Sequence, residues 1–304
     1  MIELPAIEPL PSKGPDITIG PRSTPAQEPA ASDWIHHWPE DSGAISLGRC
    51  SQSSDFLLRF PDLADFLISA DGSALGAWPA PETNADTLRH LILDQVLPRV
   101  LAHRGQLVLH AGAARIGQEA IAFIGETGRG KSTLTASFHA AGYPLLSDDG
   151  LVLMQGDGTT CAQPTYPSLR LWPEAVAGLF ARTPDLAPMA HYSSKQRVTL
   201  KDTADNKPVS LAAIYVLAPE TQEDAEGISL TTVSPSEACM AIISNSFQLD
   251  VTDRPRAMSL LTVASNIAEQ LPVFALAFQR SFASLPAVRE VILKQHCQKA
   301  TADR

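Results

Sequence analysis

The stretch FIGETGRGKSTL, from Phe123 to Leu134, places a glycine-rich loop between an apolar run and a run with helical character. Residues 125–132 match the pattern G-x-x-x-x-G-K-[S/T] at each defined position. Glycine permits the curvature that points successive backbone amides at phosphate oxygens, and the amino end of the following helix adds its positive dipole. The stretch therefore predicts a phosphate-binding loop, or P-loop, between a strand and a helix.

The loop residues and the start of the helix are expected to hold the phosphates of a nucleotide. Lys131 would reach the β- and γ-phosphates, and the Ser132 hydroxyl would take a place on Mg²⁺. Thr133 is expected to act as a helix residue rather than as a second metal ligand. The nucleotide-binding residues predicted from the motif are Gly125, Glu126, Thr127, Gly128, Arg129, Gly130, Lys131, Ser132 and Thr133.

Two adjacent carboxylates, Asp148 and Asp149, follow the loop after one predicted helix and one predicted strand. In a parallel sheet the strand after the P-loop helix ends at the same edge as the loop, so the pair should lie beside the phosphates. One carboxylate would bind Mg²⁺ and the other would accept a proton from an attacking hydroxyl. We place Ser132 and Asp149 at the metal. A polar turn after a buried strand is the alternative interpretation.

Four further residues were considered for the site. His110 ends the strand QLVLH, whose hairpin partner leads into the loop; a lone histidine is usually structural, but this one would orient an aspartate or share its proton. Arg170 stands in an apolar setting and needs a partner, either phosphate or an acidic side chain. Lys195 and Arg197 would lie on one side of an extended segment and contact substrate or phosphate, or else belong to a solvated loop.

The composition and charge of the whole chain exclude several classes of protein. The net charge of −10 argues against a protein that binds a nucleic-acid backbone, and the absence of a long apolar run argues against a membrane span. Scattered cysteines and the lack of a signal-like start favour a cytoplasmic protein. Strands and helices alternate in a way that predicts a three-layer core. Residues 160–206 are predicted to be rich in loops, apart from a short helix over 172–180, and Trp172 is expected in the core.

Several segments together resemble the HPr kinase/phosphorylase family and its HPr-kinase-like relatives. The resemblance is strongest over residues 88–153 and does not include the N-terminal arm. The segments that carry it are LVLHAGAARI (107–116), AIAFIGETGRGKSTLTASF (120–138), GYPLLSDDGLVL (142–153) and LPVFALAF (271–278).

This resemblance implies transfer of a phosphoryl group from ATP to a serine hydroxyl, with Mg²⁺ as cofactor. Lys131 and Ser132 would then bind phosphate and metal. Asp148 and Asp149 would supply metal binding and the catalytic base, with His110 supporting them.

One departure from the family concerns the segment YPSLRLWPEAVAGL, residues 166–179, which stands where the bifunctional enzymes carry an EIRGLG-type signature. Arg170 corresponds to the signature arginine, but Ser168 replaces the glutamate two positions before it. This difference argues against phosphorolysis and against HPr as substrate. The chain looks more like stand-alone HPr-kinase-like proteins of lasso-peptide clusters, which phosphorylate a serine near the C-terminus of a precursor peptide.

The expected fold class is α/β, with a P-loop kinase core of the HPr kinase / phosphoenolpyruvate carboxykinase type and a small β-rich N-terminal portion. The expected organisation is a proline-rich disordered arm (1–31), the β-rich portion (32–85) and the kinase domain (86–300). The expected partners are ATP and a peptide or small protein with an acceptor serine. Neither nucleic acid nor a membrane is expected as a partner. A homo-oligomer remains possible, because relatives often form oligomers. A small-molecule kinase and a non-catalytic nucleotide-binding regulatory module remain alternatives.

Overall fold

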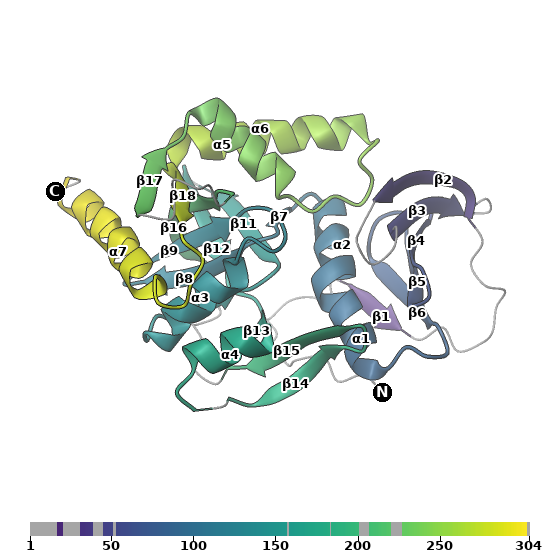
Figure 1. Ribbon diagram of the computed structural model, residues 1–304. Coiled ribbons are helices and arrows are strands. Elements are labelled where there is room, and N and C mark those ends of the chain that lie inside the picture. The colour runs from purple at the N-terminus through teal and green to yellow at the C-terminus, as the bar shows by residue number, and fades with distance from the viewer. Residues whose placement is uncertain are drawn as a thin grey trace. The chain divides into compact units, whose positions relative to one another are not determined.

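The computed structural model describes residues 17–20, 31–38, 45–50, 53–156, 158–182, 184–200, 207–219 and 227–302. The chain is a mixed α/β protein with several sheets, and it divides into two compact units (Figure 1). The first unit comprises Met1–Gln106, Met189–Ser193 and Phe247–Ser259. The second comprises Leu107–Pro188, Ser194–Ser246 and Leu260–Arg304. Most of the predicted proline-rich arm lies outside the described residues.

The first unit contains a six-stranded sheet in the order β1-β6-β5-β4-β3-β2. Adjacent strands are antiparallel except for β1 and β6, which are parallel. Its buried face is apolar at alternate positions, as the two-residue period of a strand requires, with Phe66 and Ile68 fully buried in β5. The strands are β1 (Thr18–Gly20), β2 (Ala31–Trp38), β3 (Ile45–Cys50), β4 (Phe56–Phe60), β5 (Ala64–Ile68) and β6 (Ala74–Pro79).

A helical segment of the first unit packs on this sheet through its apolar side chains. Asn84 caps its start, because its side chain accepts a hydrogen bond from the backbone of Thr87. The middle of the segment is a π-helical turn that ends directly before Leu97-Pro98, and proline cannot donate the backbone hydrogen bond of a regular helix. The three parts are α1 (Ala85–His90), η1 (Leu91–Val96) and α2 (Leu97–His103).

The second unit is built on a nine-stranded sheet whose central strands β9, β16 and β18 run parallel. β10 is antiparallel to β8, and β8 is antiparallel to β9, so β9 and β10 point the same way. Their carboxyl ends therefore lie at the same edge of the sheet, with β8 between them. The strands are β7 (Leu107–Leu109), β8 (Gly112–Ile116), β9 (Glu119–Ile124), β10 (Leu145–Ser147), β11 (Leu151–Gly156), β12 (Thr159–Gln163), β16 (Val209–Leu217), β17 (Ile228–Thr232) and β18 (Val273–Phe278).

Helices cover both faces of this sheet and complete the predicted three-layer core (Figure 1). Ile124 faces the core cluster that includes side chains of α5 (Pro235–Ser244) and α6 (Arg254–Gln270). Its neighbour Phe123 faces the opposite cluster, with α3 (Lys131–Ala140) and α7 (Leu285–Ala302). Strand β9 is thus buried on both faces, which fixes the position of the loop that follows it. Among the described residues, no helix has the length and apolar character needed to cross a membrane.

A separate three-stranded sheet, in the order β13-β15-β14, corrects the prediction that residues 160–206 are mainly loops. Its strands are β13 (Ser168–Leu171), β14 (Leu186–Ala190) and β15 (Ser193–Thr199). They are short and carry charged residues, so they lack the long apolar run that identifies a central strand from sequence. The predicted short helix is present as α4 (Pro173–Leu179), and its side chains share a core cluster with α3 and this sheet.

We predict that Gly112→Ala destabilises the second unit, because the P-loop helix packs directly against this position of β8. A Cβ at Gly112 would lie 2.0 Å from Thr135 Oγ1, and Thr135 is buried with its hydroxyl bonded to the Lys131 carbonyl. Overpacking of this kind should lower the free energy of unfolding by about 1–3 kcal/mol in urea denaturation.

The matched control is Gly156→Ala, where an added Cβ meets no atom within 4 Å. This substitution should change the free energy of unfolding by less than about 0.5 kcal/mol. Adding Thr135→Ala to Gly112→Ala should recover part of the loss. Equal stabilities of the two alanine variants would contradict the close packing of α3 on β8.

Candidate functional site

The P-loop connects β9 to α3, and three of its glycines adopt conformations that other residues rarely take. The φ angles of Gly125, Gly128 and Gly130 are 144°, 82° and 90°. A Cβ at Gly125 would also lie only 3.0 Å from the carbonyl oxygen of Leu217. At the start of α3, Gly130 offers no side chain to accept hydrogen bonds from the first backbone amides. These amides, together with the helix dipole, suit an anion.

Lys131 points back into the curve of the loop. It is buried, and its Nζ donates hydrogen bonds to the carbonyl oxygens of Gly125 at 2.6 Å and Glu126 at 3.1 Å. Burial lowers the pKa of Lys131, and the negative charges of Asp149 and Asp148 oppose that effect. The lysine therefore lies within electrostatic reach of both aspartates.

The side chains at the variable positions of the loop point elsewhere. Glu126 and Thr127 are exposed, and Glu126 forms an ion pair with Arg129. Their contribution to a phosphate site would thus come from the backbone. Ser132 and Thr133 are half-buried in the first turn of α3.

The aspartate pair lies in a tight turn directly after β10. The Ser147 hydroxyl closes the turn by donating to the carbonyl oxygen of Gly150 at 2.8 Å. Asp149 has a φ of 77°, a left-handed conformation that is uncommon for a residue with a side chain. Such conformations are retained where the surroundings hold them and are frequent at functional sites. The turn gives the two carboxylates different surroundings although they are neighbours in sequence.

Asp148 is buried against the P-loop helix and β13. Its Oδ2 accepts a hydrogen bond from the backbone N–H of Arg170 at 2.9 Å, and the Ser132 hydroxyl donates to the same carboxylate group. Its Oδ1 is buried and has no hydrogen-bond partner among the described residues. A buried carboxylate oxygen without a partner needs an explanation, and a proton or a cation would supply one.

Asp149 lies between a histidine and an arginine. His110 Nε2 lies 3.4 Å from Asp149 Oδ1, and Arg170 Nε lies 3.3 Å from Asp149 Oδ2. The Arg170 guanidinium also donates to the carbonyl oxygens of Asp148 and Ser168, each at 3.2 Å. Arg170 therefore has the acidic partner that its apolar surroundings demanded, and it fixes the Asp149 carboxylate from one side while His110 does so from the other.

These surroundings drive the pKa values of the two aspartates apart. Burial raises the pKa of Asp148 to about 7, and the charge of Asp149 adds to this effect. Burial acts on Asp149 in the same sense, but the His110 hydrogen bond and the charges of Arg170 and Lys195 hold its pKa well below the usual range. Near neutral pH, Asp149 is thus ionised while Asp148 is partly protonated. Adjacent titratable groups with separated pKa values are typical of acid–base sites.

The remaining predicted cations come from β15. Lys195 influences the pKa values of both Lys131 and Asp149 through its charge. Arg197 lies opposite Arg170 in the antiparallel pairing of β15 with β13. Both are half-buried in a strand, so the alternative of a solvated loop is wrong. The expectation that Trp172 lies in the core is also wrong. It is 48% exposed at the junction of β13 and α4, with Lys195 Nζ 5.3 Å from its ring centroid.

Sequence reasoning missed Asn245, which follows α5. Its Oδ1 accepts a hydrogen bond from the backbone N–H of Gly125, the first residue of the P-loop, at 2.9 Å. Asparagine at a helix end is a common capping residue, so only the fold could connect this position with the loop.

The oxygen donors beside the loop fit Mg²⁺. The Ser132 hydroxyl and the Asp148 carboxylate, with its partnerless Oδ1, are hard oxygen ligands of the kind that Mg²⁺ takes. The described residues contain no group of three or more His, Cys, Asp or Glu that could hold a metal alone. Asp149 is the aspartate expected at the metal from the sequence, but it is the Asp148 carboxylate that accepts the hydrogen bond of Ser132.

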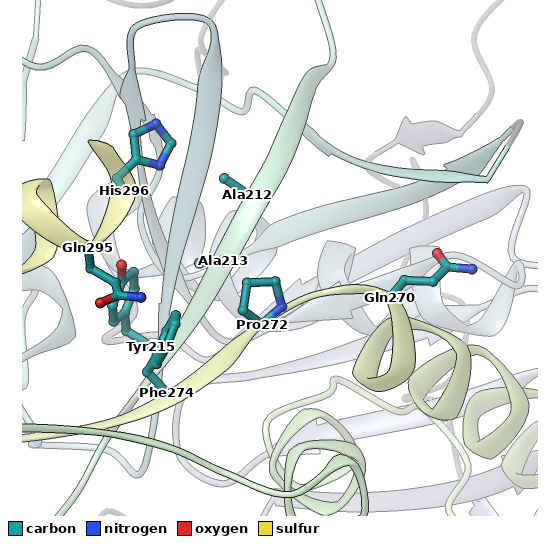
Figure 2. Close-up of a pocket in the computed structure, with 8 residues that line it drawn as sticks. All are labelled: Ala212, Ala213, Tyr215, Gln270, Pro272, Phe274, Gln295 and His296. Atoms are coloured by element: carbon teal, nitrogen blue, oxygen red, sulfur yellow. The ribbon is translucent and has the colours of Figure 1, made fainter. Parts of the chain in front are cut away.

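A cavity of about 450 Å³ lies elsewhere in the second unit (Figure 2). Tyr215 and Phe274 stack beside it, and Gln295 and His296 of α7 lie at its border. The other lining residues are Ala212, Ala213, Gln270 and Pro272. It shares no lining residue with the P-loop cluster and borders the amino-terminal part of β18, whereas the P-loop follows the carboxyl end of β9. We therefore do not place the phosphates there.

We predict that the stability of the protein depends on the protonation of Asp148. A carboxyl group whose pKa is raised by folding contributes stability that is lost as pH rises from about 4, its value in the unfolded chain, toward its folded value of about 7. Between pH 5 and pH 8 the free energy of unfolding should fall by about 1–2 kcal/mol more in the wild type than in Asp148→Asn, measured by urea denaturation.

Asp149→Asn provides the opposite control. The charged form of Asp149 is favoured in the folded state, so its removal should lower stability at both pH values. Because the charge of Asp149 also raises the pKa of Asp148, the fall in stability between pH 5 and pH 8 should be smaller in this variant than in the wild type. Parallel pH profiles for the wild type and Asp148→Asn would show that Asp148 is ionised throughout this range.

No protein-family model matches the chain. No curated protein matches it. Among solved structures, the chain is similar to the Hpr(Ser) kinase/phosphatase from Coxiella burnetii, with 13% sequence identity and a TM-score of 0.34; the match covers 64% of this chain and 98% of that chain.

Proposed function

We propose that this chain is an ATP-dependent kinase that transfers the γ-phosphoryl group to a serine hydroxyl of a peptide or small protein. The observation that carries the proposal is the position of the Asp149 carboxylate, which lies between His110 at 3.4 Å and Arg170 at 3.3 Å in the turn beside the P-loop lysine. A P-loop alone indicates nucleotide binding. The addition of an oriented carboxylate provides a group that can receive the proton of an acceptor hydroxyl.

The nucleotide phosphates would bind in the loop. Backbone amides of residues 125–132 would contact the phosphate oxygens, and Lys131 would exchange its carbonyl contacts for the β- and γ-phosphates. Ser132 and Asp148 would hold Mg²⁺. When bound, the metal would neutralise negative charge on the phosphate oxygens. A cation there would also keep Asp148 ionised, since an adjacent positive charge lowers a carboxyl pKa.

The acceptor serine would approach Asp149. This carboxylate is 22% exposed, against 2% for Asp148, so it is the more accessible of the pair. His110 and Arg170 fix its orientation, and Lys195 lies near enough to stabilise charge on the transferring group. Phosphoryl transfer requires little covalent help from the protein, so positioning and charge neutralisation would carry the catalysis.

The class of acceptor rests on the resemblance in sequence. The HPr-kinase-like pattern favours a serine in a peptide or small protein, and Ser168 in place of the signature glutamate argues against HPr and against the reverse phosphorolysis. A serine near the C-terminus of a lasso-peptide precursor is the acceptor that this pattern favours. Candidate peptides should therefore carry a serine at or near their C-terminus.

We predict that Lys131→Ala and Asp149→Asn each abolish transfer, for different reasons. The lysine variant should lose nucleotide binding. The aspartate variant should bind nucleotide within a few-fold of wild type but lower kcat by about 10²–10⁴-fold, the contribution typical of a general base. Purified protein with labelled ATP, offered to a panel of serine peptides and metabolites, measures transfer; titration with a fluorescent ATP analogue measures binding.

Glu290→Gln is the matched control, because it neutralises a carboxylate that is 70% exposed on α7. It should transfer at the wild-type rate. Wild-type rates from both site variants would refute the proposed mechanism. Labelling of a metabolite but of no peptide would favour a small-molecule kinase, and tight ATP binding without any labelled acceptor would favour a regulatory module.

A further inference from the structure

We propose that Asn245 is a positioning residue that holds the first residue of the P-loop and the backbone of His110 in register; this inference rests on the proposed function of the same site. Asn245 is the C-cap of α5, and its side chain and carbonyl make three hydrogen bonds in addition to those of its backbone N–H. Its Oδ1 accepts from Gly125 N–H at 2.9 Å, and its Nδ2 donates to the Ala241 carbonyl at 2.8 Å. Its carbonyl accepts from the His110 N–H at 2.7 Å.

The side chain has to be an amide of this length. One end accepts a hydrogen bond from the loop while the other donates to the last turn of α5, and an amide carries this acceptor and this donor on two separate atoms. Aspartate would keep the acceptor and lose the donor. A shorter hydroxyl would cap the helix without reaching Gly125. The half-buried Asn245 thus joins two segments that are 120 residues apart in sequence.

The following residue strengthens the same connection. Ser246 forms an antiparallel β-bridge with Leu109, and its hydroxyl donates to the Ile242 carbonyl at 2.7 Å. The two residues after α5 therefore pair with Leu109 and His110, the end of β7 and the residue after it. The position of the His110 backbone is fixed by this pairing, and the position of its ring relative to Asp149 depends on it.

α5, which carries these contacts, is held in place by its N-terminal cap and by its buried side chains. Ser234 and Glu237 form a capping box at its start, and Ala238, Cys239 and Ile242 are buried in the core cluster on the sheet. Because Gly125 has a φ of 144°, its conformation has to be held by its surroundings, and the Asn245 hydrogen bond does so from a rigid element. Asn245 acts on the phosphates only through Gly125, so it is a positioning residue and not a catalytic one.

Asn245→Ser separates the two roles of the side chain. A serine at this position can still donate to the carbonyl four residues earlier, as Ser246 does to Ile242, but it is too short to accept from Gly125. The loss of one hydrogen bond that orders the loop should raise Kd for a fluorescent ATP analogue and KM for ATP about three- to tenfold, while kcat stays within about threefold. Exchange of the Gly125 amide with deuterium should become faster.

Thr159→Ala is the control, because it removes a side-chain hydrogen bond to a backbone carbonyl at an exposed position of the second unit, away from α5 and Gly125. It should leave Kd and KM unchanged. If Asn245→Ser reduces only the amount of folded protein, or lowers kcat with KM unchanged, Asn245 has a purely structural role and the inference is wrong. A wild type that binds no ATP would instead refute the proposed function, and the exchange rate of Gly125 would still test the hydrogen bond.

Discussion

The geometry of the candidate site depends on how two adjacent carboxylates are accommodated at a largely buried position. Two neighbouring buried charges of the same sign are unfavourable unless cations compensate them or one becomes neutral. The structure does both. Asp149 remains charged between His110 and Arg170, and Asp148 shifts toward its protonated form. The left-handed turn at Asp149 makes this possible by giving the two carboxylates different surroundings.

Arg170 links this charge balance to the rest of the second unit. Its backbone N–H bonds to Asp148 and its guanidinium to Asp149, so one residue of β13 contacts both carboxylates. β13 belongs to the small sheet, whose core cluster includes Ala136 of α3 and Leu145 of β10. The elements that carry the P-loop and the aspartates are therefore packed against the element that neutralises them.

Local sequence signals predicted the glycine loop, the helix after it and the strand that precedes the two aspartates. The glycines, Lys131 and the helix after them form a motif whose spacing reflects backbone geometry, and α3 begins at Lys131 as expected. The direction of β10 followed from its place after the P-loop helix, although β8 lies between β10 and β9. His110 became a candidate through an expected hairpin between its strand and the strand that leads into the loop, and that pairing is wrong, because β7 pairs with β11 whereas β9 pairs with β8.

The parts that sequence could not predict depend on contacts between distant segments. Asn245 has no periodic or motif signal, and its bond to Gly125 exists only because α5 packs on the sheet beside β9. The small sheet was missed because its strands are short and interrupted by charged residues, and Trp172 was misplaced because apolar type was taken as evidence of burial. Secondary-structure propensity reflects residues that are close in sequence. The Asn245 hydrogen bond, the small sheet and the exposure of Trp172 depend on residues that are close only in the folded structure.

The local charge of the site differs in sign from that of the chain. The sequence carries a net charge of −10, yet Lys131, Arg170 and Lys195 gather around a single firmly ionised carboxylate. Such an arrangement gives a positive local potential, which suits the polyphosphate of the proposed nucleotide. The three positive charges of Lys131, Arg170 and Lys195 outnumber the one negative charge of Asp149. An ionised Asp148 would use part of it, so binding of a cation or loss of a proton at Asp148 and binding of phosphate at Lys131 are electrostatically coupled.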